Sequence, residues 1–132
     1  MPCSIPTSNS FRGLYGAYMG GDRKRVAAAF APDVQWHNSG YDATSGTMVG
    51  VEAVLGYLMG ENHMEDYSLD VVDMLASDER VAIIARTSGR RGTQEIVNDF
   101  VQVIRLVDGR VGEVWNYAWD QRALAEFMPV IA

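Results

Sequence analysis

The stretch that decides the fold is residues 94–127, QEIVNDFVQVIRLVDGRVGEVWNYAWDQRALAEF. Two segments of alternating residues flank Asp108-Gly109, and an Asp-Gly pair between such segments is a strong β-hairpin signal because both turn residues tolerate positive φ. We therefore expect two long strands joined at this turn. The aromatic run 115–119 then stops at Asp120, which is followed by residues that favour a short helix.

Polar residues recur at strand spacing inside these otherwise apolar segments. They are Asn98, Gln102, Asn116 and Asp120. A buried polar group needs a hydrogen-bond partner, so these side chains either serve the fold or face a cavity. That alternative is the functional question the sequence poses.

The rest of the chain places helices first and strands afterwards. Helical spacing predicts helices over residues 11–19, 22–30 and 51–60, and alternation predicts strands over 34–38, 67–75, 80–88, 95–107 and 110–119. We expect a loop over 40–50 and turns at 77–79 and 89–92. Helices followed by an antiparallel meander predict an α+β fold, with the helices packed on one face of a curved sheet.

Length and charge limit the class of protein. A chain of 132 residues fits one domain, 1–132, whose first eight residues we expect to be flexible. The net charge of −6 argues against nucleic acid as a partner, because phosphate binding needs a basic face. No apolar stretch reaches the ~20 residues that span a bilayer, and no signal peptide is evident. We expect a soluble cytoplasmic protein without a membrane partner.

Cysteine and histidine are scarce. Cys3 is the only cysteine, so no intrachain disulfide can form. Together with two histidines it does not make a common zinc site. His63 lies near Glu61, Glu65 and Asp66, but in a polar connection with nothing to fix metal geometry. We expect no metal.

The strand over residues 95–107 carries apolar side chains on both faces. A sheet solvated on one side shows apolar-polar alternation instead, so something covers the second face as well. With the helices on one side, the simplest cover is another subunit. We predict a homodimer formed through the outer face of the sheet.

Several motifs in this order resemble those of a known superfamily. They are Gly20-Gly21-Asp22 between two helices, FAPDVQWH at 30–37, a helix preceded by glycine, DGRVGEVW at 108–115 and DQRALAEF at 120–127. This arrangement resembles the nuclear transport factor 2-like superfamily, and within it the SnoaL-like group, which includes polyketide cyclase-like and ketosteroid isomerase-like proteins. The resemblance covers residues 11–127. It implies an α+β, cystatin-like cone: a curved antiparallel sheet on three N-terminal helices around an internal pocket, with a short C-terminal helix.

The resemblance also suggests which side chains line that pocket. Counting from Asp33 and from the Asp108-Gly109 turn, pocket positions of the superfamily fall on Trp36, Asn38, Gln102 and Asn116. The general base of the isomerases matches Asn38, and their catalytic tyrosine matches Leu14, one position from Tyr15. Positions of the epoxide hydrolase triad fall on Ala85, Thr87 and Asn116. Both known catalytic sets are therefore absent.

The residues that remain suggest a ligand that is fairly apolar and carries a carbonyl. Amides at Asn38, Gln102 and Asn116, with Asn98 nearby, could orient its oxygen atoms, while Trp36, Tyr15 and Tyr57 line the apolar wall. The alternative is an internal polar network bridged by water. No cofactor is required. The preferred function is acid-base chemistry such as cyclisation, isomerisation or dehydration, and the competing one is a non-catalytic binding or dimeric interaction module.

Two residues are candidates to move a proton. Asp120 is the carboxylate nearest the pocket positions, although a helix cap explains it at least as well. His37 is the second candidate because histidine is the commonest proton shuttle, but by alternation it points away from Trp36 and Asn38, toward the surface or a subunit interface. Trp115, Tyr117 and Trp119 share this opposite face with Glu113.

Overall fold

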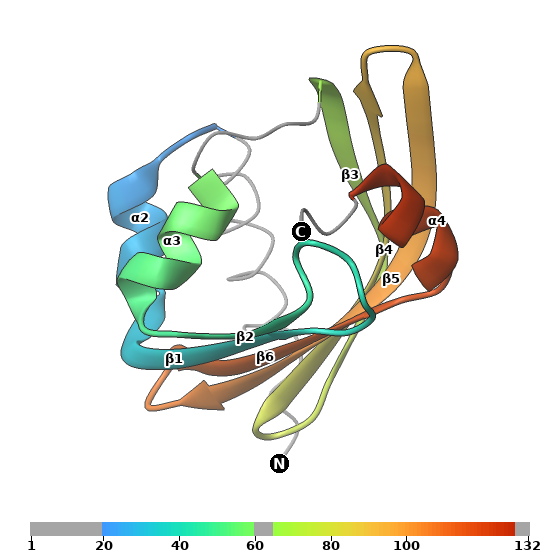
Figure 1. The fold of residues 1–132 in the computed structure, drawn as a ribbon. Coiled ribbons are helices and arrows are strands. Elements are labelled where there is room, and N and C mark those ends of the chain that lie inside the picture. Colours follow the sequence, from blue (N-terminus) through green and yellow to red (C-terminus); the bar gives the residue numbers. More distant parts are fainter. Residues whose placement is uncertain (1–19, 60–64, 129–132) are drawn as a thin grey trace.

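The protein is a strongly curved sheet with helices on its inner side (Figure 1). The computed structural model describes residues 20–59 and 65–128, and within them a six-stranded sheet is seen. In chain order the elements are α2 (Arg23–Ala28), β1 (Phe30–Asn38), β2 (Gly46–Val49), α3 (Val51–Met59), β3 (Glu65–Ala76), β4 (Arg80–Arg91), β5 (Gln94–Val107), β6 (Arg110–Ala118) and α4 (Gln121–Phe127). The predicted α+β class is confirmed.

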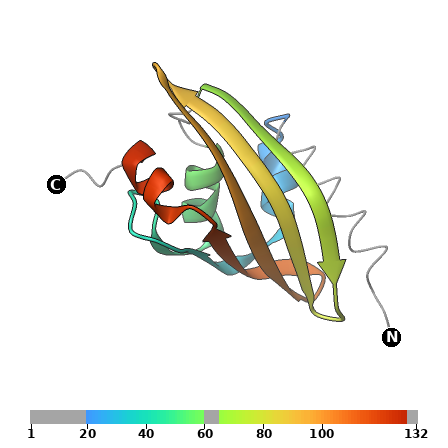
Figure 2. The same ribbon diagram turned by 90° about the vertical axis from the view of Figure 1, so that its right-hand side faces the viewer.

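The strand order brings the first strand beside the last. The order is β2-β1-β6-β5-β4-β3, in which β3 to β6 form the predicted antiparallel meander. Strand β1 pairs with β6 in parallel and with β2 antiparallel. Figure 2 looks onto the long strands β3, β4 and β5 and shows how they curve around the helices behind them.

The hairpin at Asp108-Gly109 sets the register of the site. Both residues have positive φ, 51° and 77°, which confirms the turn that the Asp-Gly pair predicts. The resulting register places Gln102 opposite Asn116, and the parallel pairing places Asn116 opposite Asn38. Three amide residues from β5, β6 and β1 therefore lie in one row across the sheet.

The core lies between the inner face of the sheet and the helices. Inner side chains from three strands are fully buried, among them Val34 of β1, Val81 and Ile83 of β4 and Val114 of β6. Helix α3 contributes Val54 and Leu55 to the same cluster, and α2 contributes Val26. Apolar burial of this kind is the main favourable term in folding, and here it holds the helices on one side of the sheet.

Three local predictions need correction. Residues 46–49, expected in a loop, form β2, because the chain turns back and Met48 pairs with Trp36. Strand β1 begins at Phe30, earlier than expected, and pairs there with Val111. Gly89 lies inside β4, so the turn follows Arg91. The helix expected over 11–19 lies outside the described residues.

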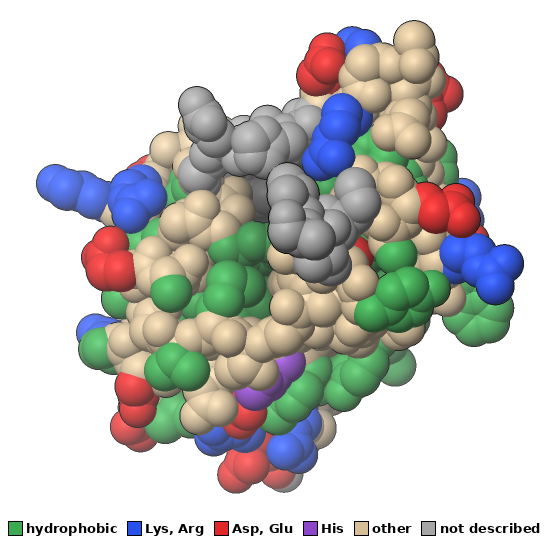
Figure 3. All heavy atoms as spheres, viewed as in Figure 1, with side chains coloured by type: hydrophobic (Ala, Val, Ile, Leu, Met, Phe, Trp, Pro, Cys, Tyr) green, Lys and Arg blue, Asp and Glu red, His purple; other side chains and the backbone are tan. Residues whose placement is uncertain are grey.

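On the side shown in Figure 3, acidic and basic side chains lie mainly around the edge of the outline, with apolar and uncharged side chains between them. Within residues 20–59 and 65–128, no helix combines the length and apolar character needed to cross a membrane.

Candidate functional site

A chain of hydrogen-bonded amides crosses the inner wall of the sheet. Gln102 Nε2 donates to Asn116 Oδ1 at 2.9 Å, and Asn116 Nδ2 donates to Asn38 Oδ1 at 2.9 Å. Asn38 Nδ2 in turn donates to the backbone carbonyl of Thr44 at 2.8 Å. Three of the predicted binding residues are thus brought together, each from a different strand.

Trp36 forms the apolar side of this cluster. Its indole Nε1 donates to Asn38 Oδ1 at 2.9 Å, so the same oxygen accepts two hydrogen bonds. The ring packs edge-on against Tyr57 of α3, with 6.0 Å between ring centroids, and against Phe30 at 6.4 Å. Tyr57, predicted as a wall residue, is 41% exposed, and the predicted Tyr15 lies outside the described residues.

Asn98 is separate from the amide chain. Its Nδ2 donates to the Asp120 carbonyl at 3.0 Å, and its Oδ1 accepts from the Asp120 backbone nitrogen at 3.1 Å. The amide of Asn98 therefore fixes the backbone at the start of α4. The Asp120 side chain caps that helix, because its Oδ1 accepts from Ala123 N at 2.9 Å.

His37 lies on the outer face, as the alternation of β1 predicts. Its Nε2 is 2.7 Å from Glu113 Oε2, its Nδ1 is 2.8 Å from Thr47 Oγ1, and its ring stacks on Trp115. Glu113 also accepts from Arg105 at 3.3 Å. These side chains form a ladder across β2, β1, β6 and β5 on the side of the sheet opposite to the amides.

The contacts in this ladder lower the pKa of the Glu113 carboxyl group. The hydrogen bond from His37 is the main reason that the pKa of Glu113 is below its ordinary value, and the hydrogen bond from Arg105 acts in the same direction. Partial burial opposes both but does not outweigh them. The carboxylate is therefore held in its ionised form by groups on neighbouring strands.

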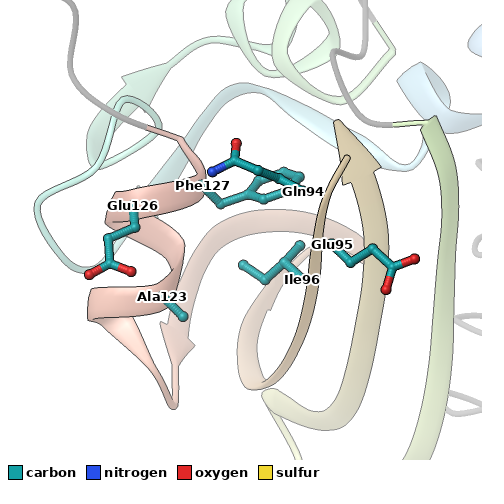
Figure 4. Close-up of a pocket in the computed structure, with 6 residues that line it drawn as sticks. All are labelled: Gln94, Glu95, Ile96, Ala123, Glu126 and Phe127. Atoms are coloured by element: carbon teal, nitrogen blue, oxygen red, sulfur yellow. The ribbon is translucent and has the colours of Figure 1, made fainter. Parts of the chain in front are cut away.

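A shallow groove of about 190 Å³ lies elsewhere, between α4 and the start of β5. Its lining residues are Gln94, Glu95, Ile96, Ala123, Glu126 and Phe127. Figure 4 shows the apolar side chains turned toward the groove and the carboxylates of Glu95 and Glu126 turned away from it. Among the residues that the structure describes, none of those predicted for the site lines this groove.

Sequence reasoning missed the contribution of the loop between β1 and β2. Thr44 takes part through its backbone carbonyl, which no side-chain pattern reveals. Asp42, which holds Thr44, is 4% exposed. The sequence Asp42-Ala-Thr-Ser is nevertheless typical of a turn in which an aspartate accepts from backbone and hydroxyl groups, and this was the available signal.

Comparison with known proteins supports the fold and its family. The family model of the SnoaL-like domain matches residues 11–114. This chain belongs to the SnoaL-like family. No curated protein sequence matches it significantly.

Solved structures similar to this SnoaL-like domain cover nearly its whole length. Bal32a, from a soil-derived mobile gene cassette, is 25% identical with a TM-score of 0.83, covering 92% of this chain and 95% of its own. A protein with a cystatin-like fold from Xanthomonas campestris is 29% identical with a TM-score of 0.76, covering 92% and 97%. A structure described as a SnoaL-like polyketide cyclase, from Jannaschia sp. CCS1, is 14% identical with a TM-score of 0.78, covering 95% and 93%. The nuclear transport factor 2-like architecture implied by the resemblance is confirmed.

Proposed function

We propose that this SnoaL-like domain binds a small, largely apolar molecule through a carbonyl or similar acceptor oxygen, at the site formed by Asn38, Asn116, Gln102 and Trp36. The observation that carries the proposal is the convergence of three amides and one indole, from three strands, on the inner wall of the sheet. A few polar groups in otherwise apolar surroundings are the usual form of a small-molecule site.

The composition of the site supports binding in preference to proton transfer. Within residues 20–59 and 65–128, the side chains of Asn38 and Asn116 form hydrogen bonds with amides, an indole and a backbone carbonyl. None of these groups titrates near neutral pH. His37 is engaged with Glu113 on the opposite face, which leaves it distant from the amides.

Acid-base catalysis without a cofactor is the second candidate, and one observation favours it. Asn98 anchors the backbone of Asp120 with both atoms of its amide, so this carboxylate has a fixed position at the end of the inner wall. Its Oδ1 accepts from Ala123 N, and in the described part of the chain Oδ2 has no such contact. In this candidate Asp120 moves the proton of a cyclisation, isomerisation or dehydration, and the amides orient the substrate oxygen.

Binding and catalysis are separated by two measurements. Titration of the ¹⁵N-labelled protein with cyclic ketones and lactones should perturb the side-chain amide signals of Asn38 and Asn116, and titration with cyclohexylammonium, which has no acceptor, should not. Equal responses to both classes would refute the binding proposal. For a ligand that is turned over, Asp120→Asn retains an acceptor for the helix cap but has no base, so loss of turnover with α4 intact would favour catalysis.

We further propose that the partner at the outer face is a second copy of this chain. Tyr117 and Val101, a cross-strand pair on that face, are 52% and 37% exposed, and Trp119 is 86% exposed. The ion pairs Arg86–Asp99 and Arg105–Glu113 give the same face nearly balanced charge, although the whole chain carries −6. Two copies can therefore meet there without strong repulsion.

Light scattering at micromolar concentration tests the dimer. The wild-type protein should have twice the mass of the chain, and Val101→Asp should shift the mass to that of a monomer. The matched change Val72→Asp, at an exposed position in the irregular part of β3, should leave the dimer intact. A monomeric wild-type protein would contradict the proposal.

A further inference from the structure

The loop between β1 and β2 is organised around one buried carboxylate. Asp42 Oδ1 accepts from the backbone nitrogen of Thr44 at 2.7 Å and from the Thr44 hydroxyl, and Asp42 Oδ2 lies 3.2 Å from Ser45 Oγ. The backbone nitrogen of Ala43 donates to the Met128 carbonyl at 2.9 Å, which ties the loop to the end of α4. Thr44 is therefore held firmly in one position.

Thr44 and Trp36 together determine which way the Asn38 amide faces. The Thr44 carbonyl can only accept a hydrogen bond, and the Trp36 indole can only donate one. Asn38 lies between them, so its Nδ2 must face Thr44 and its Oδ1 must face Trp36. A flipped amide would oppose oxygen to oxygen on one side and N–H to N–H on the other.

The orientation of the Asn38 amide also fixes the orientations of the Asn116 and Gln102 amides. Because Oδ1 of Asn38 faces Asn116, Asn116 must present its Nδ2 there and turn its Oδ1 toward Gln102. Gln102 must then donate through Nε2. The direction of each hydrogen bond in the site follows from the carbonyl of Thr44 at one end and the indole of Trp36.

We propose that Asp42 is a positioning residue for the amide site: by holding Thr44, it fixes the direction of the hydrogen bonds that run from Gln102 through Asn116 to Asn38. In the described part of the chain the Asp42 carboxylate forms no hydrogen bond with the amides, and it acts on them only through the Thr44 backbone. Its carboxylate is an acceptor with no donor of its own, which suits it to hold two donors of one residue.

The fixed direction has a consequence for the ligand, and this part rests on the proposed function. Asn38 Oδ1 already accepts two hydrogen bonds, so that oxygen has no remaining lone pair for a donor. Asn38 and Asn116 each carry a second N–H, for which no acceptor is seen within residues 20–59 and 65–128. Asn38 can therefore meet a ligand only as a donor, so the site favours a ligand that carries a hydrogen-bond acceptor, and Asp42 maintains that preference.

Nuclear magnetic resonance without any ligand tests the positioning role. The three tryptophan indole signals can be assigned with Trp115→Phe and Trp119→Phe. In Asp42→Ala, the Trp36 indole signal should move and its hydrogen exchange should accelerate about fivefold, as expected when one hydrogen bond is lost. The Asn116 side-chain signals should move with it. Asp42→Asn keeps an acceptor oxygen for Thr44 and should restore both signals.

Further variants keep the test decisive. Asp99→Asn, which removes a carboxylate from an exposed ion pair on the outer face, should leave the indole and amide signals unchanged. If Asp42→Ala does not fold, Thr44→Val removes one of the two donors to Asp42 and should shift the same signals by a smaller amount. Unchanged Trp36 and Asn116 signals in a folded Asp42→Ala, or in Thr44→Val when the former fails, would overturn the proposal.

Cyclohexanone and cyclohexylammonium serve as probes for the selectivity. Wild type and Asp42→Asn should bind cyclohexanone more tightly than cyclohexylammonium, and Asp42→Ala should bind cyclohexanone about fivefold more weakly than wild type. If wild type binds neither probe while the ligand-free signals respond as expected, the carbonyl-binding function fails and the positioning role stands. If both probes bind unchanged in Asp42→Ala, the role of Asp42 in selectivity is refuted.

Discussion

Asn116 donates a hydrogen bond from Nδ2 to Oδ1 of Asn38 at 2.9 Å, across the parallel pair formed by β6 and β1. The two residues are 78 positions apart in the chain. Their contact joins the first strand, β1, to β6, the strand that follows the Asp108-Gly109 turn, and it is the middle link of the amide site.

Removal of the middle link should destabilise the protein. Asn116→Ala removes the acceptor of the Gln102 Nε2 hydrogen bond and one of the two donors to Asn38 Oδ1, and we expect a loss of about 1–3 kcal/mol in the free energy of unfolding. Urea denaturation measures this loss. Gln35→Ala, which truncates an exposed amide on β1, should change the stability by less than about 0.5 kcal/mol. Equal effects of the two changes would contradict the network.

Trp36 combines a packing role with a hydrogen bond, and two substitutions separate them. Trp36→Phe keeps an aromatic ring against Tyr57 but removes the donor to Asn38, which should cost about 1–2 kcal/mol. Trp36→Ala also removes the buried ring and should cost about 3–5 kcal/mol. Thermal and urea unfolding give both values. The control Trp119→Phe, at a position that is 86% exposed, should leave the free energy of unfolding nearly unchanged. If Trp36→Phe lowers that free energy as much as Trp36→Ala does, the separation into a packing role and a hydrogen bond is refuted.

The cap of α4 predicts a specific order among Asp120 variants. Asp120→Ala removes the acceptor for Ala123 N and should cost about 1 kcal/mol. Asp120→Asn keeps a capping oxygen and should cost only a small fraction of this. Chemical denaturation measures both. An asparagine variant as unstable as the alanine variant would show that the charge, and not the capping hydrogen bond, is what matters.

The ladder on the outer face predicts a stability that depends on pH. Because the pKa of Glu113 in the folded protein is below its ordinary value of 4.5, its stabilising contribution is fully present above that value. The contribution is lost as pH falls through the lowered pKa. The difference in unfolding free energy between wild type and Glu113→Gln should therefore shrink as the pH falls below about 4.5.

The matched control is Glu126→Gln, which removes an exposed glutamate outside the ladder. The difference in unfolding free energy between wild type and Glu126→Gln should not show the pH dependence expected for Glu113→Gln. A difference in unfolding free energy between wild type and Glu113→Gln that grows as the pH falls below about 4.5 would have the wrong sign and would exclude the proposed cause.

The sequence predicts most of the sheet because its signals are local. Asp108-Gly109 specifies its own turn, and the alternation from Gln94 to Val107 specifies which side chains share a face. The same alternation correctly assigns His37 to the face opposite Trp36. Inner-wall positions for Asn38, Gln102 and Asn116 follow from periodicity and from the resemblance together.

What the sequence does not predict depends on contacts between distant segments. Strand β2 forms because Thr47 and Met48 find partners on β1, although Gly46 and the polar residues before it favour a loop. The amide of Asn98 is satisfied by the backbone of Asp120, a partner 22 residues away. The side chain alone does not show whether such an amide serves a helix end or a ligand.

The parallel pairing of β1 with β6 also affects how the protein folds. The meander from β3 to β6 can form by pairing of neighbouring segments. Strand β1 can pair with β6 only when these two distant segments come together, and closing so long a loop is slow. The hydrogen bond from Asn116 to Asn38, and with it the complete amide site, forms only at that stage. We therefore expect ligand affinity to appear late in refolding, so that incompletely folded or truncated chains that lack β6 are unable to bind.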